Sequence, residues 1–454
     1  MAKATTRFVC NNCGAVVSSW AGRCAQCGEW NTIVEEVQLA TTAGTGLNKK
    51  AGSGTVLKPQ AVAQSAAAQD KRMPTGIRDV DAVLGGGIVA GSVNLIAGQP
   101  GIGKSTLLLQ LASLVAKDHN VLYVSGEESD HQVGMRAQRL GVAGAERLQL
   151  ATTNIAEDVA ATVADGQYDF VVVDSIQTMT VAAVAAAPGS VSQITNSTAV
   201  LVAAAKASNT AMFVVGHVTK EGSIAGPKVL EHIVDVVLQL EGDAYGGFKV
   251  LRATKNRFGP TSEAAIMEMD EHGLHPVDNP SQALLAERQV SDGSVVLATL
   301  EGTRPLLVEV QALVNKTAYG YPKRAASGID LNRVNLLIAM LERRTKLNLS
   351  DQDIYINIVG GIRLSDPAAD LAICLAIGSA AKGLQLKQNA VVFGEVGLSG
   401  EVRHVPFIEK RVGEAQKLGF DVAIGPQARG NKAKLPFLHV VPDVRTALNE
   451  FLEK

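Results

Sequence analysis

Short runs of apolar residues, each followed by a stretch with helical periodicity, dominate the middle of the chain. Between residue 73 and about residue 280 these runs read VNLIAG, NVLYVSG, DFVVVDS, AMFVVGH, VVLQLEG and FKVLRATKN. Valine-rich runs without polar alternation are typical of strands that are buried on both faces, and intervening helices favour parallel pairing of such strands. The pattern therefore predicts an α/β domain whose mostly parallel sheet is covered by helices.

The hydrophobic pattern also separates this domain from the segments on either side. Residues 38–72 are mainly Ala, Gly, Ser, Thr and Gln, a composition typical of flexible linkers. A further block starts near residue 285 with strand-like runs such as SVVLATLE and IYINIVGG, and helical patterns follow near 332–344 and 367–382. We therefore expect an N-terminal motif at 1–37, a linker at 38–72, the α/β domain at 73–284 and a C-terminal domain at 285–454.

Composition and charge narrow the class of protein without changing this layout. The 454 residues are 46% hydrophobic, which suffices for several packed cores, but no apolar run reaches the roughly 18 residues that a membrane span needs. The first ten residues lack the apolar stretch of a signal peptide, so we expect a cytoplasmic protein without a membrane partner. The formal net charge is −2, so any contact with a polyanion must come from local patches.

Two C-x-x-C pairs near the N-terminus predict a metal site. Four of the 5 cysteines lie in the first 27 residues, namely Cys10, Cys13, Cys24 and Cys27. Thiolates stay reduced in the cytosol, and four of them suit the tetrahedral coordination of zinc. Incidental thiols and a redox pair are the alternatives, but the motif is doubled and no strand–helix unit surrounds it. We therefore predict a structural Zn²⁺ site.

A glycine-rich segment after the strand-like run VNLIAG has the form G-x-x-x-x-G-K-S. Such a loop wraps backbone N–H groups around the phosphates of a nucleotide, the lysine reaches the β and γ oxygens, and the serine hydroxyl coordinates Mg²⁺. We therefore predict ATP and Mg²⁺ as cofactors. The predicted nucleotide-binding residues are Gly98, Gln99, Pro100, Gly101, Ile102, Gly103, Lys104, Ser105 and Thr106.

Polar residues at the ends of three other strand-like runs complete the predicted catalytic site. Asp174 ends DFVVVD and is expected to hold Mg²⁺ together with Ser105; a helix cap is the alternative. Glu127 and Glu128 follow VLYVSG, and one of them is expected to orient the attacking water. We prefer Glu127, although both could simply stabilise a helix N-terminus. His217 ends AMFVVGH and is a candidate sensor of the γ-phosphate, with a structural histidine as the alternative.

Three features occur together in this chain: the segment TGIRDVDAVLGGGIVAGSVNLIAGQPGIGKST, the four-cysteine motif and the pentapeptide KNRFG. In this combination the chain resembles the bacterial RadA (Sms) family of recombination and repair ATPases over nearly its whole length. The resemblance implies a RecA-type ATPase core and a DNA-stimulated hexameric ring that acts on single-stranded and branched DNA. It also implies branch migration of recombination intermediates alongside the RecA recombinase. Two alternatives are an ATP-dependent protease-like protein and a nucleotide-gated adaptor that does not move on DNA.

Two groups of cations are candidates for DNA contacts. By the resemblance, residues 179–197 and 219–227 correspond to the central-channel loops of RecA-type rings, where Lys220 and Lys228 are available for phosphates. In VNKTAYGYPKR, cations alternate with tyrosines, a pattern that suits stacking on single-stranded nucleic acid. A solvated surface loop is the alternative for both groups. The candidates in the second group are Lys316, Lys323 and Arg324, beside Tyr319 and Tyr321.

From about residue 353 the chain resembles the proteolytic domain of Lon-type proteases, which implies an α+β fold. That family carries a nucleophilic serine after a proline, but here Ala368 follows Pro367. Glu409 stands where the family has its lysine base, with Lys410 one place later. Because an alanine has no hydroxyl to activate, we predict a protease fold without peptidase activity.

The segment ATKNRFGPT places two cations, Lys255 and Arg257, on a short turn after the last strand-like run of the α/β domain. A phosphate site that already has Lys104 and Mg²⁺ needs no further cation from its own subunit. A cation delivered to the neighbouring subunit's γ-phosphate would act as an arginine finger. We therefore predict that Lys255 and Arg257 act in trans, with Phe258 as a packed anchor and Gly259-Pro260 fixing the turn. An edge turn with solvated cations is the alternative.

Overall fold

The computed structural model of the chain describes residues 5–10, 16–17, 19–28, 30, 33–38, 72–217, 229–242, 248–318, 320–386, 389–428 and 435–453. The chain divides into two compact units, Met1–Ala68 and Gln69–Lys454, which are described separately below. Within the described residues, no helix is long and apolar enough to cross a membrane.

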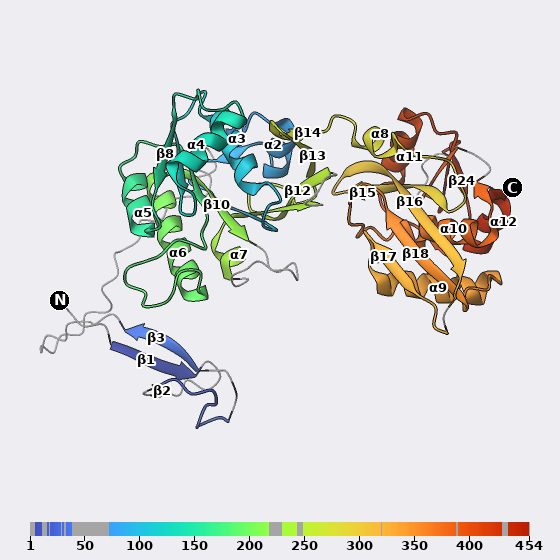
Figure 1. Cartoon of the computed structure of the whole chain (residues 1–454), viewed down its shortest axis with the longest axis horizontal. Coiled ribbons are helices and arrows are strands. Elements are labelled where there is room, and N and C mark those ends of the chain that lie inside the picture. Colours follow the sequence, from blue (N-terminus) through green and yellow to red (C-terminus); the bar gives the residue numbers. More distant parts are fainter. Residues whose placement is uncertain are drawn as a thin grey trace, which may run out of the picture. The chain divides into compact units, whose positions relative to one another are not determined.

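The N-terminal unit contains a small antiparallel sheet with the strand order β2-β1-β3 (Figure 1). Its strands are β1 (Thr5–Cys10), β2 (Val16–Val17) and β3 (Ile33–Gln38). Cys24 and Ile33 are buried, and Phe8, Val17 and Cys27 pack against them. A cluster of this size is too small to stabilise a fold by apolar burial alone, so this unit needs a cross-link or a metal.

The first part of the second unit is built on a nine-stranded sheet with the order β14-β13-β12-β11-β6-β10-β9-β7-β8. The strands from β11 to β8 in this order run parallel, as the valine-rich runs predict, and β12, β13 and β14 add an antiparallel edge. The parallel strands are β6 (Val93–Gly98), β7 (Val121–Ser125), β8 (Leu148–Thr152), β9 (Phe170–Asp174), β10 (Ala211–His217) and β11 (Val236–Gly242). The antiparallel strands are β12 (Phe248–Asn256), β13 (Ala264–Asp270) and β14 (Gly273–Pro276).

Helices cover both faces of this sheet. Alternate residues of the central strands are therefore buried in two different hydrophobic clusters, one on each face. Ile96 packs with Leu107 and Val133 from α3 and α4, whereas Leu95 packs with Val159 and Leu201 from α5 and α6. This two-sided burial explains why the strands read as continuous apolar runs. The helices are α2 (Arg78–Leu84), α3 (Lys104–Val115), α4 (Asp130–Arg139), α5 (Ala156–Ala164), α6 (Val191–Ser208) and α7 (Val229–Ile233).

Strand β12 contains a β-bulge close to its end. It pairs regularly with β11 up to Ala253, which lies opposite Leu238, but Lys255 lies opposite Val237. Thr254 is therefore an extra residue in the ladder. Bulges of this kind turn the side chains that follow them relative to the regular alternation of a strand.

The C-terminal block contains a seven-stranded mixed sheet with the order β17-β18-β16-β15-β20-β23-β24 (Figure 1). The predicted helices near 332–344 and 367–382 are present as α9 and α10, and α10 is almost entirely buried. The strands are β15 (Ser294–Glu301), β16 (Arg304–Lys316), β17 (Arg324–Ser327), β18 (Gln352–Ile358), β20 (Ala390–Val392), β23 (Val422–Gly425) and β24 (Leu438–Val440). The helices are α8 (Pro280–Leu285), α9 (Leu331–Thr345), α10 (Ala369–Lys382), α11 (Ile408–Lys417) and α12 (Val444–Phe451).

Short two-stranded pairs complete the second unit. They are β4 (Arg72–Met73) with β5 (Ile88–Val89), β19 (Gln385–Leu386) with β25 (Leu452–Glu453), and β21 (Glu395–Val396) with β22 (Val402–Arg403).

One hydrophobic core joins β12 and β13 to the C-terminal block. Val250, Ala264 and Ile266 belong to the same buried cluster as Leu284 and Val295. An ion pair of 2.9 Å between Arg252 of β12 and Glu301 of β15 adds to this contact. Burial nevertheless raises the pKa of Glu301 above its ordinary value. The antiparallel edge of the nine-stranded sheet is thus part of the support for the C-terminal block.

Candidate active site

The predicted phosphate-binding loop connects β6 to α3 and has the backbone geometry that the motif requires. Gly101 and Gly103 have positive φ angles of 77° and 112°, a region that favours glycine. Gly103 is also the N-cap of α3, and no side chain caps the first N–H groups of this helix. A Cβ atom on Gly103 would lie 2.3 Å from Cε of Met269, so a larger residue does not fit. The loop and the helix N-terminus together form an anion-binding site.

Lys104 lies under this loop as a buried cation. Its side chain donates hydrogen bonds of 2.9 Å to the carbonyl oxygens of Gly98 and Gln99, and the residue is 4% exposed. Burial lowers the pKa of Lys104 to about 8, although the carboxylates of Asp174 and Glu127 partly offset this effect. The ammonium group is thus held by neutral carbonyls at the place where a phosphate would arrive.

Strand register brings the other predicted residues to the same edge of the sheet. His217 at the end of β10 pairs with Gly98 at the end of β6, and Asp174 at the end of β9 pairs with Ser125 at the end of β7. Glu127 lies two residues after the end of β7. The side chain of His217 lies outside the described residues, so its role stays a prediction.

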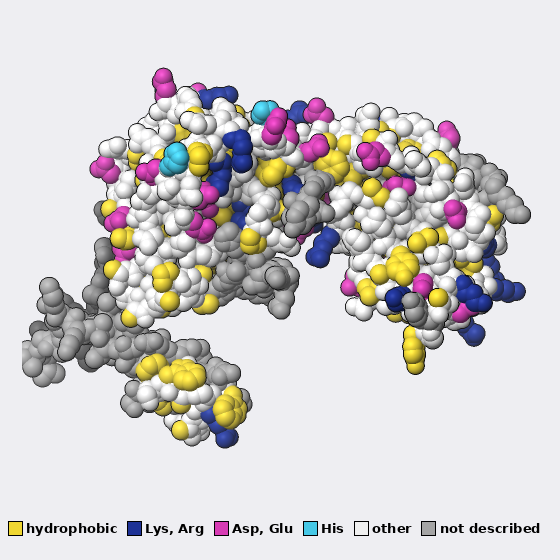
Figure 2. All heavy atoms as spheres, viewed as in Figure 1, with side chains coloured by type: hydrophobic (Ala, Val, Ile, Leu, Met, Phe, Trp, Pro, Cys, Tyr) yellow, Lys and Arg dark blue, Asp and Glu magenta, His cyan; other side chains and the backbone are white. Residues whose placement is uncertain are grey.

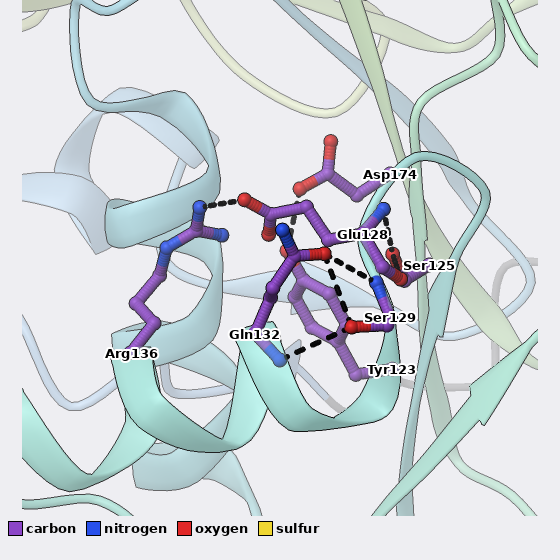
Figure 3. Close-up of polar contacts among 7 residues, drawn as sticks. All are labelled: Tyr123, Ser125, Glu128, Ser129, Gln132, Arg136 and Asp174. Atoms are coloured by element: carbon purple, nitrogen blue, oxygen red, sulfur yellow. Dashed lines mark hydrogen bonds and ion pairs between the residues drawn. The ribbon is translucent and has the colours of Figure 1, made fainter.

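Two hydroxyl groups hold the two carboxylates that the sequence singled out. Tyr123 donates a hydrogen bond of 2.6 Å from its hydroxyl to Oδ2 of Asp174, and Figure 3 shows these two side chains pointing toward one another. Ser175 donates from Oγ to Oε1 of Glu127. The N–H of Gly126 also donates to the carbonyl of Asp174 at 2.7 Å, which ties the ends of β7 and β9 together.

Glu128 has a different environment from Glu127. Its carboxylate forms an ion pair of 2.5 Å with Arg136 on α4 (Figure 3). Its backbone N–H donates to Oγ of Ser125 at 3.0 Å, and Ser129 begins α4 with a capping box to Gln132. The helix N-terminus that was the alternative for this segment is therefore present, with Ser129 as its cap and Glu128 directly before it. Glu127 is the glutamate whose charge acts on Lys104.

The KNRFG segment is held by its own subunit. Lys255 donates to the carbonyl oxygens of Glu231 and Val234 at 2.5 and 2.8 Å, around the C-terminal end of α7. Arg257 lies 2.9 Å from Asp235, whose side chain is only 5% exposed. The turn also packs closely, because a Cβ atom on Gly259 would lie 2.7 Å from Cα of Gly85. Phe258 packs against the core of the sheet, as an anchor should.

This segment and the P-loop of the same chain lie at opposite ends of the sheet's strands. The P-loop is at the end where the parallel strands finish, and the KNRFG segment is at the end where they begin. Asn256 at the end of β12 pairs with Val236, which pairs with Asn94 near the start of β6. The P-loop follows Gly98, four residues further along that strand. At roughly 3.3 Å per residue, these positions are about 13 Å apart along the strand direction, so the two cations do not approach their own P-loop.

Comparisons with known proteins identify related domains in three regions of the chain. An AAA domain matches residues 59–223, a rubredoxin metal binding domain matches residues 8–35, and the subunit ChlI of Mg-chelatase matches residues 320–429. The DNA repair protein RadA of Listeria monocytogenes is 46% identical over 100% of this chain and 98% of its own length. Those of Bacillus subtilis and Escherichia coli are 48% and 46% identical over 94% of each chain. The crystal structure of the RadB recombinase is 25% identical and covers 45% of this chain and 100% of its own, with a TM-score of 0.37.

The chain belongs to the RadA family of DNA repair proteins. The predicted RecA-like P-loop core, zinc-binding motif and Lon-like C-terminal fold are confirmed. As a RadA-family P-loop protein it uses ATP and Mg²⁺, and the match to an AAA domain supports ATP hydrolysis. The donors around Lys104 and Asp174 fit these cofactors, because a buried ammonium and a carboxylate meet at an uncapped helix N-terminus.

The zinc ribbon of this RadA-family member shows one of its two knuckles. Gly28, with φ of 76°, donates its N–H to the carbonyl of Cys24 at 2.9 Å, which closes the turn that carries Cys24 and Cys27. Cys10 is the last residue of β1, but its side chain and the whole of Cys13 lie outside the described residues. Thiolates on such a turn suit zinc, which supplies the folding energy that the small core lacks.

The structure brings part of the predicted DNA-binding set together. Lys316 pairs with Gln352 and Arg324 pairs with Ile354, so both lie near the start of β18. Lys323 precedes Arg324, and Tyr321 is 88% exposed. Figure 2 shows lysine and arginine side chains gathered on this block near α9. Lys220, Lys228 and Tyr319 lie outside the described residues.

Of the two positions where the protease family has its reacting residues, Ala368 lies beside a buried ion pair and Glu409 does not. Ala368 is fully buried, and its N–H donates to Oδ1 of Asp366 at 3.0 Å. Arg411, which is also fully buried, lies 2.7 Å from the same carboxylate. Burial lowers the pKa of Arg411, and Asp366 partly offsets this effect. Glu409, in contrast, is exposed to solvent.

Sequence reasoning missed Tyr123, Ser175, Arg136 and Arg411. Ser175 follows Asp174 directly, and Arg136 lies two helical turns after Glu128, so both had a signal in their spacing. Tyr123 and Arg411 had none, because each meets its partner through the order of strands and helices in the fold.

Proposed function

We propose that this RadA-family protein is a DNA-stimulated ATPase motor that promotes branch migration of recombination intermediates. It would act as a homo-oligomeric, hexameric ring together with the RecA recombinase on single-stranded and branched DNA. The observation that carries this proposal is the position of KNRFG at the end of the strands opposite to the P-loop. Cations there are out of reach of their own nucleotide and available to a neighbour's.

The residues around the P-loop divide the work of hydrolysis. Lys104 binds the β and γ phosphates, and Ser105 and Asp174 hold the Mg²⁺ shell. When bound, Mg²⁺ neutralises the charge that develops between the β and γ phosphates. The backbone N–H groups at the start of α3 would orient the phosphates, and His217 at the end of β10 would sense the γ-phosphate.

Glu127 is the residue that orients the attacking water in this proposal. Its charge acts on Lys104, whereas the carboxylate of Glu128 is engaged by Arg136. This difference supports Glu127, the residue that the sequence analysis preferred, over Glu128.

Lys255 and Arg257 would complete the site of the next subunit. An arginine finger stabilises charge on the transferring phosphoryl group and typically contributes a factor of about 10³ to 10⁵ in turnover. In this structure both cations are satisfied by Asp235 and by carbonyls near α7. Nucleotide in the neighbouring site would compete for these cations, and this exchange would link hydrolysis in one subunit to the position of the next.

DNA contacts are assigned to Lys220 and Lys228 in the ATPase core and to Lys316, Lys323 and Arg324 in the C-terminal block. The second group lies on one exposed region beside Tyr321, which fits cations that follow a phosphate backbone and a ring that stacks on bases. The sequence contains no recognisable base-reading module, so we expect binding with little sequence preference.

The test is ATP turnover with and without single-stranded DNA, followed by extension of RecA-formed strand-exchange joints. Wild-type protein should hydrolyse ATP faster with DNA and extend the joints, and Lys104→Ala should do neither. ATP turnover that does not change when DNA is added, or joints that are not extended, would contradict the proposal of a DNA-stimulated motor. Turnover with DNA binding but without joint extension would instead favour the nucleotide-gated adaptor.

A further inference from the structure

We propose that Tyr123 and Ser175 are positioning residues that hold the metal-binding and water-orienting carboxylates from opposite strands. Tyr123 lies on β7, the strand that leads to Glu127, but its hydroxyl holds Asp174 of β9. Ser175 follows Asp174, but its hydroxyl holds Glu127. Each carboxylate is therefore oriented by the segment that carries the other. This inference rests on the proposed roles of Asp174 and Glu127 in ATP hydrolysis.

The register of β7 and β9 explains why a tyrosine is needed. Tyr123 pairs with Val172, and Ser125 pairs with Asp174, so Asp174 lies two residues further along on the same face. Two residues of a strand span roughly 6.6 Å, a distance that a long side chain can bridge but a serine or threonine cannot. Tyr123 is 1% exposed, so its ring is fixed in the core of the sheet and its hydroxyl has a defined position.

The hydrogen bond fixes one oxygen of Asp174 and leaves the other for the metal shell. Tyr123 donates to Oδ2 of Asp174 at 2.6 Å. Asp174 as a whole is 9% exposed at the end of its strand. Partners of this kind set the orientation of a metal-binding carboxylate, and losing one typically weakens metal binding about 10- to 100-fold.

The backbone keeps the two carboxylates in a fixed relation to each other. The N–H of Gly126 donates to the carbonyl of Asp174 at 2.7 Å, between the two side-chain contacts. A Cβ atom on Gly126 would lie 2.4 Å from Oγ1 of Thr178, so the loop after β9 closes tightly against this position. The metal shell and the attacking water are therefore positioned by one rigid element rather than by two independent loops.

A simpler explanation is that the buried tyrosine only satisfies its own hydroxyl. The two explanations differ in what Tyr123→Phe should change. The ring stays in place in this variant, so packing is kept, but Asp174 loses its donor. Positioning predicts a changed requirement for Mg²⁺, whereas simple satisfaction of the hydroxyl predicts a change in stability alone.

The experiment measures binding of a fluorescent, non-hydrolysable ATP analogue to the full chain as Mg²⁺ is titrated. We expect Tyr123→Phe to raise the Mg²⁺ midpoint about 10- to 100-fold, with binding in EDTA unchanged. Tyr168→Phe is the matched control, since the Tyr168 hydroxyl donates to Gln149 at 2.5 Å away from the site. It should leave the midpoint unchanged. Ser175→Ala should keep the wild-type midpoint and KM but lower kcat at least about tenfold.

The outcomes separate this inference from the proposed function. A wild-type Mg²⁺ midpoint in Tyr123→Phe, with Asp174→Asn still raising it, would overturn the inference and leave the proposed site intact. Binding that does not depend on Mg²⁺ in the wild type, or that ignores Asp174→Asn, would count against the site itself. If Tyr123→Phe fails to fold, Ser175→Ala decides: loss of kcat alone supports the inference, and unchanged kcat overturns it.

Discussion

The guanidinium group of Arg257 lies 2.9 Å from the carboxylate of Asp235, and this ion pair joins the KNRFG turn to the start of β11 on the same chain. Asp235 is nearly buried and also receives the N–H of Val93 at 3.1 Å. A role for Arg257 at a neighbour's nucleotide therefore requires that this pair be exchanged for a phosphate. The exchange makes the trans assignment open to direct tests.

Loss of the finger should abolish turnover without abolishing binding. Arg257→Ala or Lys255→Ala should bind nucleotide like the wild type but hydrolyse it at least about 100-fold more slowly, given the usual contribution of such fingers. Lys206→Ala is the matched control, because Lys206 contacts the same Asp235 at 3.4 Å but is not assigned to the neighbour's site. Its turnover should stay close to that of the wild type.

Mixing two inactive variants should restore activity if the finger acts in trans. Arg257→Ala keeps an intact P-loop, and Lys104→Ala keeps an intact finger. Assemblies that contain both would place the good finger beside the good P-loop at some of their interfaces. Mixtures that remain as inactive as either variant alone would contradict the assignment.

The two glutamates after β7 should behave differently. Glu127→Gln should retain nucleotide binding and lose at least about 100-fold in single-turnover hydrolysis, because the water loses its acceptor. Glu128→Gln should lose less than about tenfold, since Glu128 is engaged by Arg136 at 2.5 Å. A reversed order of the two variants would assign the water to Glu128.

The buried ammonium of Lys104 predicts a pH dependence of stability. Its folded pKa of about 8 lies below the ordinary value of 10.5, so between these values the unfolded chain binds more protons. The free energy of unfolding of nucleotide-free protein should therefore rise with pH, relative to Lys104→Met, by about 1 kcal/mol between pH 8 and pH 9. Denaturant unfolding at several pH values measures this difference. Lys104→Arg keeps its charge throughout, so its stability relative to Lys104→Met should not change over this range.

Restoring the two protease residues should not restore proteolysis. Ala368 is fully buried beside the Asp366–Arg411 ion pair, whereas Glu409 is exposed. The double variant Ala368→Ser, Glu409→Lys should therefore remain inactive in a casein degradation assay. The wild type serves as the baseline, and Thr303→Ala, at the carbonyl that accepts from Lys410, controls for disturbance of the surrounding loop. Measurable casein cleavage by the double variant would show that the site is intact apart from two side chains.

The sequence predicted what depends on neighbouring residues in the chain. The valine-rich runs predicted the parallel strands, and the eight-residue P-loop motif predicted the loop after β6 and the helix that begins at Lys104. Both patterns are local, because burial on two faces and phosphate binding each leave a trace within a single segment.

What could not be predicted depends on the order of the strands. Tyr123 and Asp174 are 51 residues apart and meet only because β9 lies beside β7. The choice between Glu127 and Glu128 stayed open for the same reason, since it depends on which of them faces Lys104 and which faces Arg136. Arg411 is one place beyond Glu409 and Lys410, and only packing shows that it pairs with Asp366.

The bulge at Thr254 determines which face of the sheet the first side chains of the KNRFG motif lie on. Side chains of a strand alternate between its faces, so a single extra residue reverses the face of every residue after it. Lys255 follows this residue directly, and its contact with the end of α7 depends on the reversal. In a relative without the extra residue, the same five residues would place their side chains on the opposite face of the sheet. The motif is therefore defined by its register in β12 as much as by its amino-acid sequence.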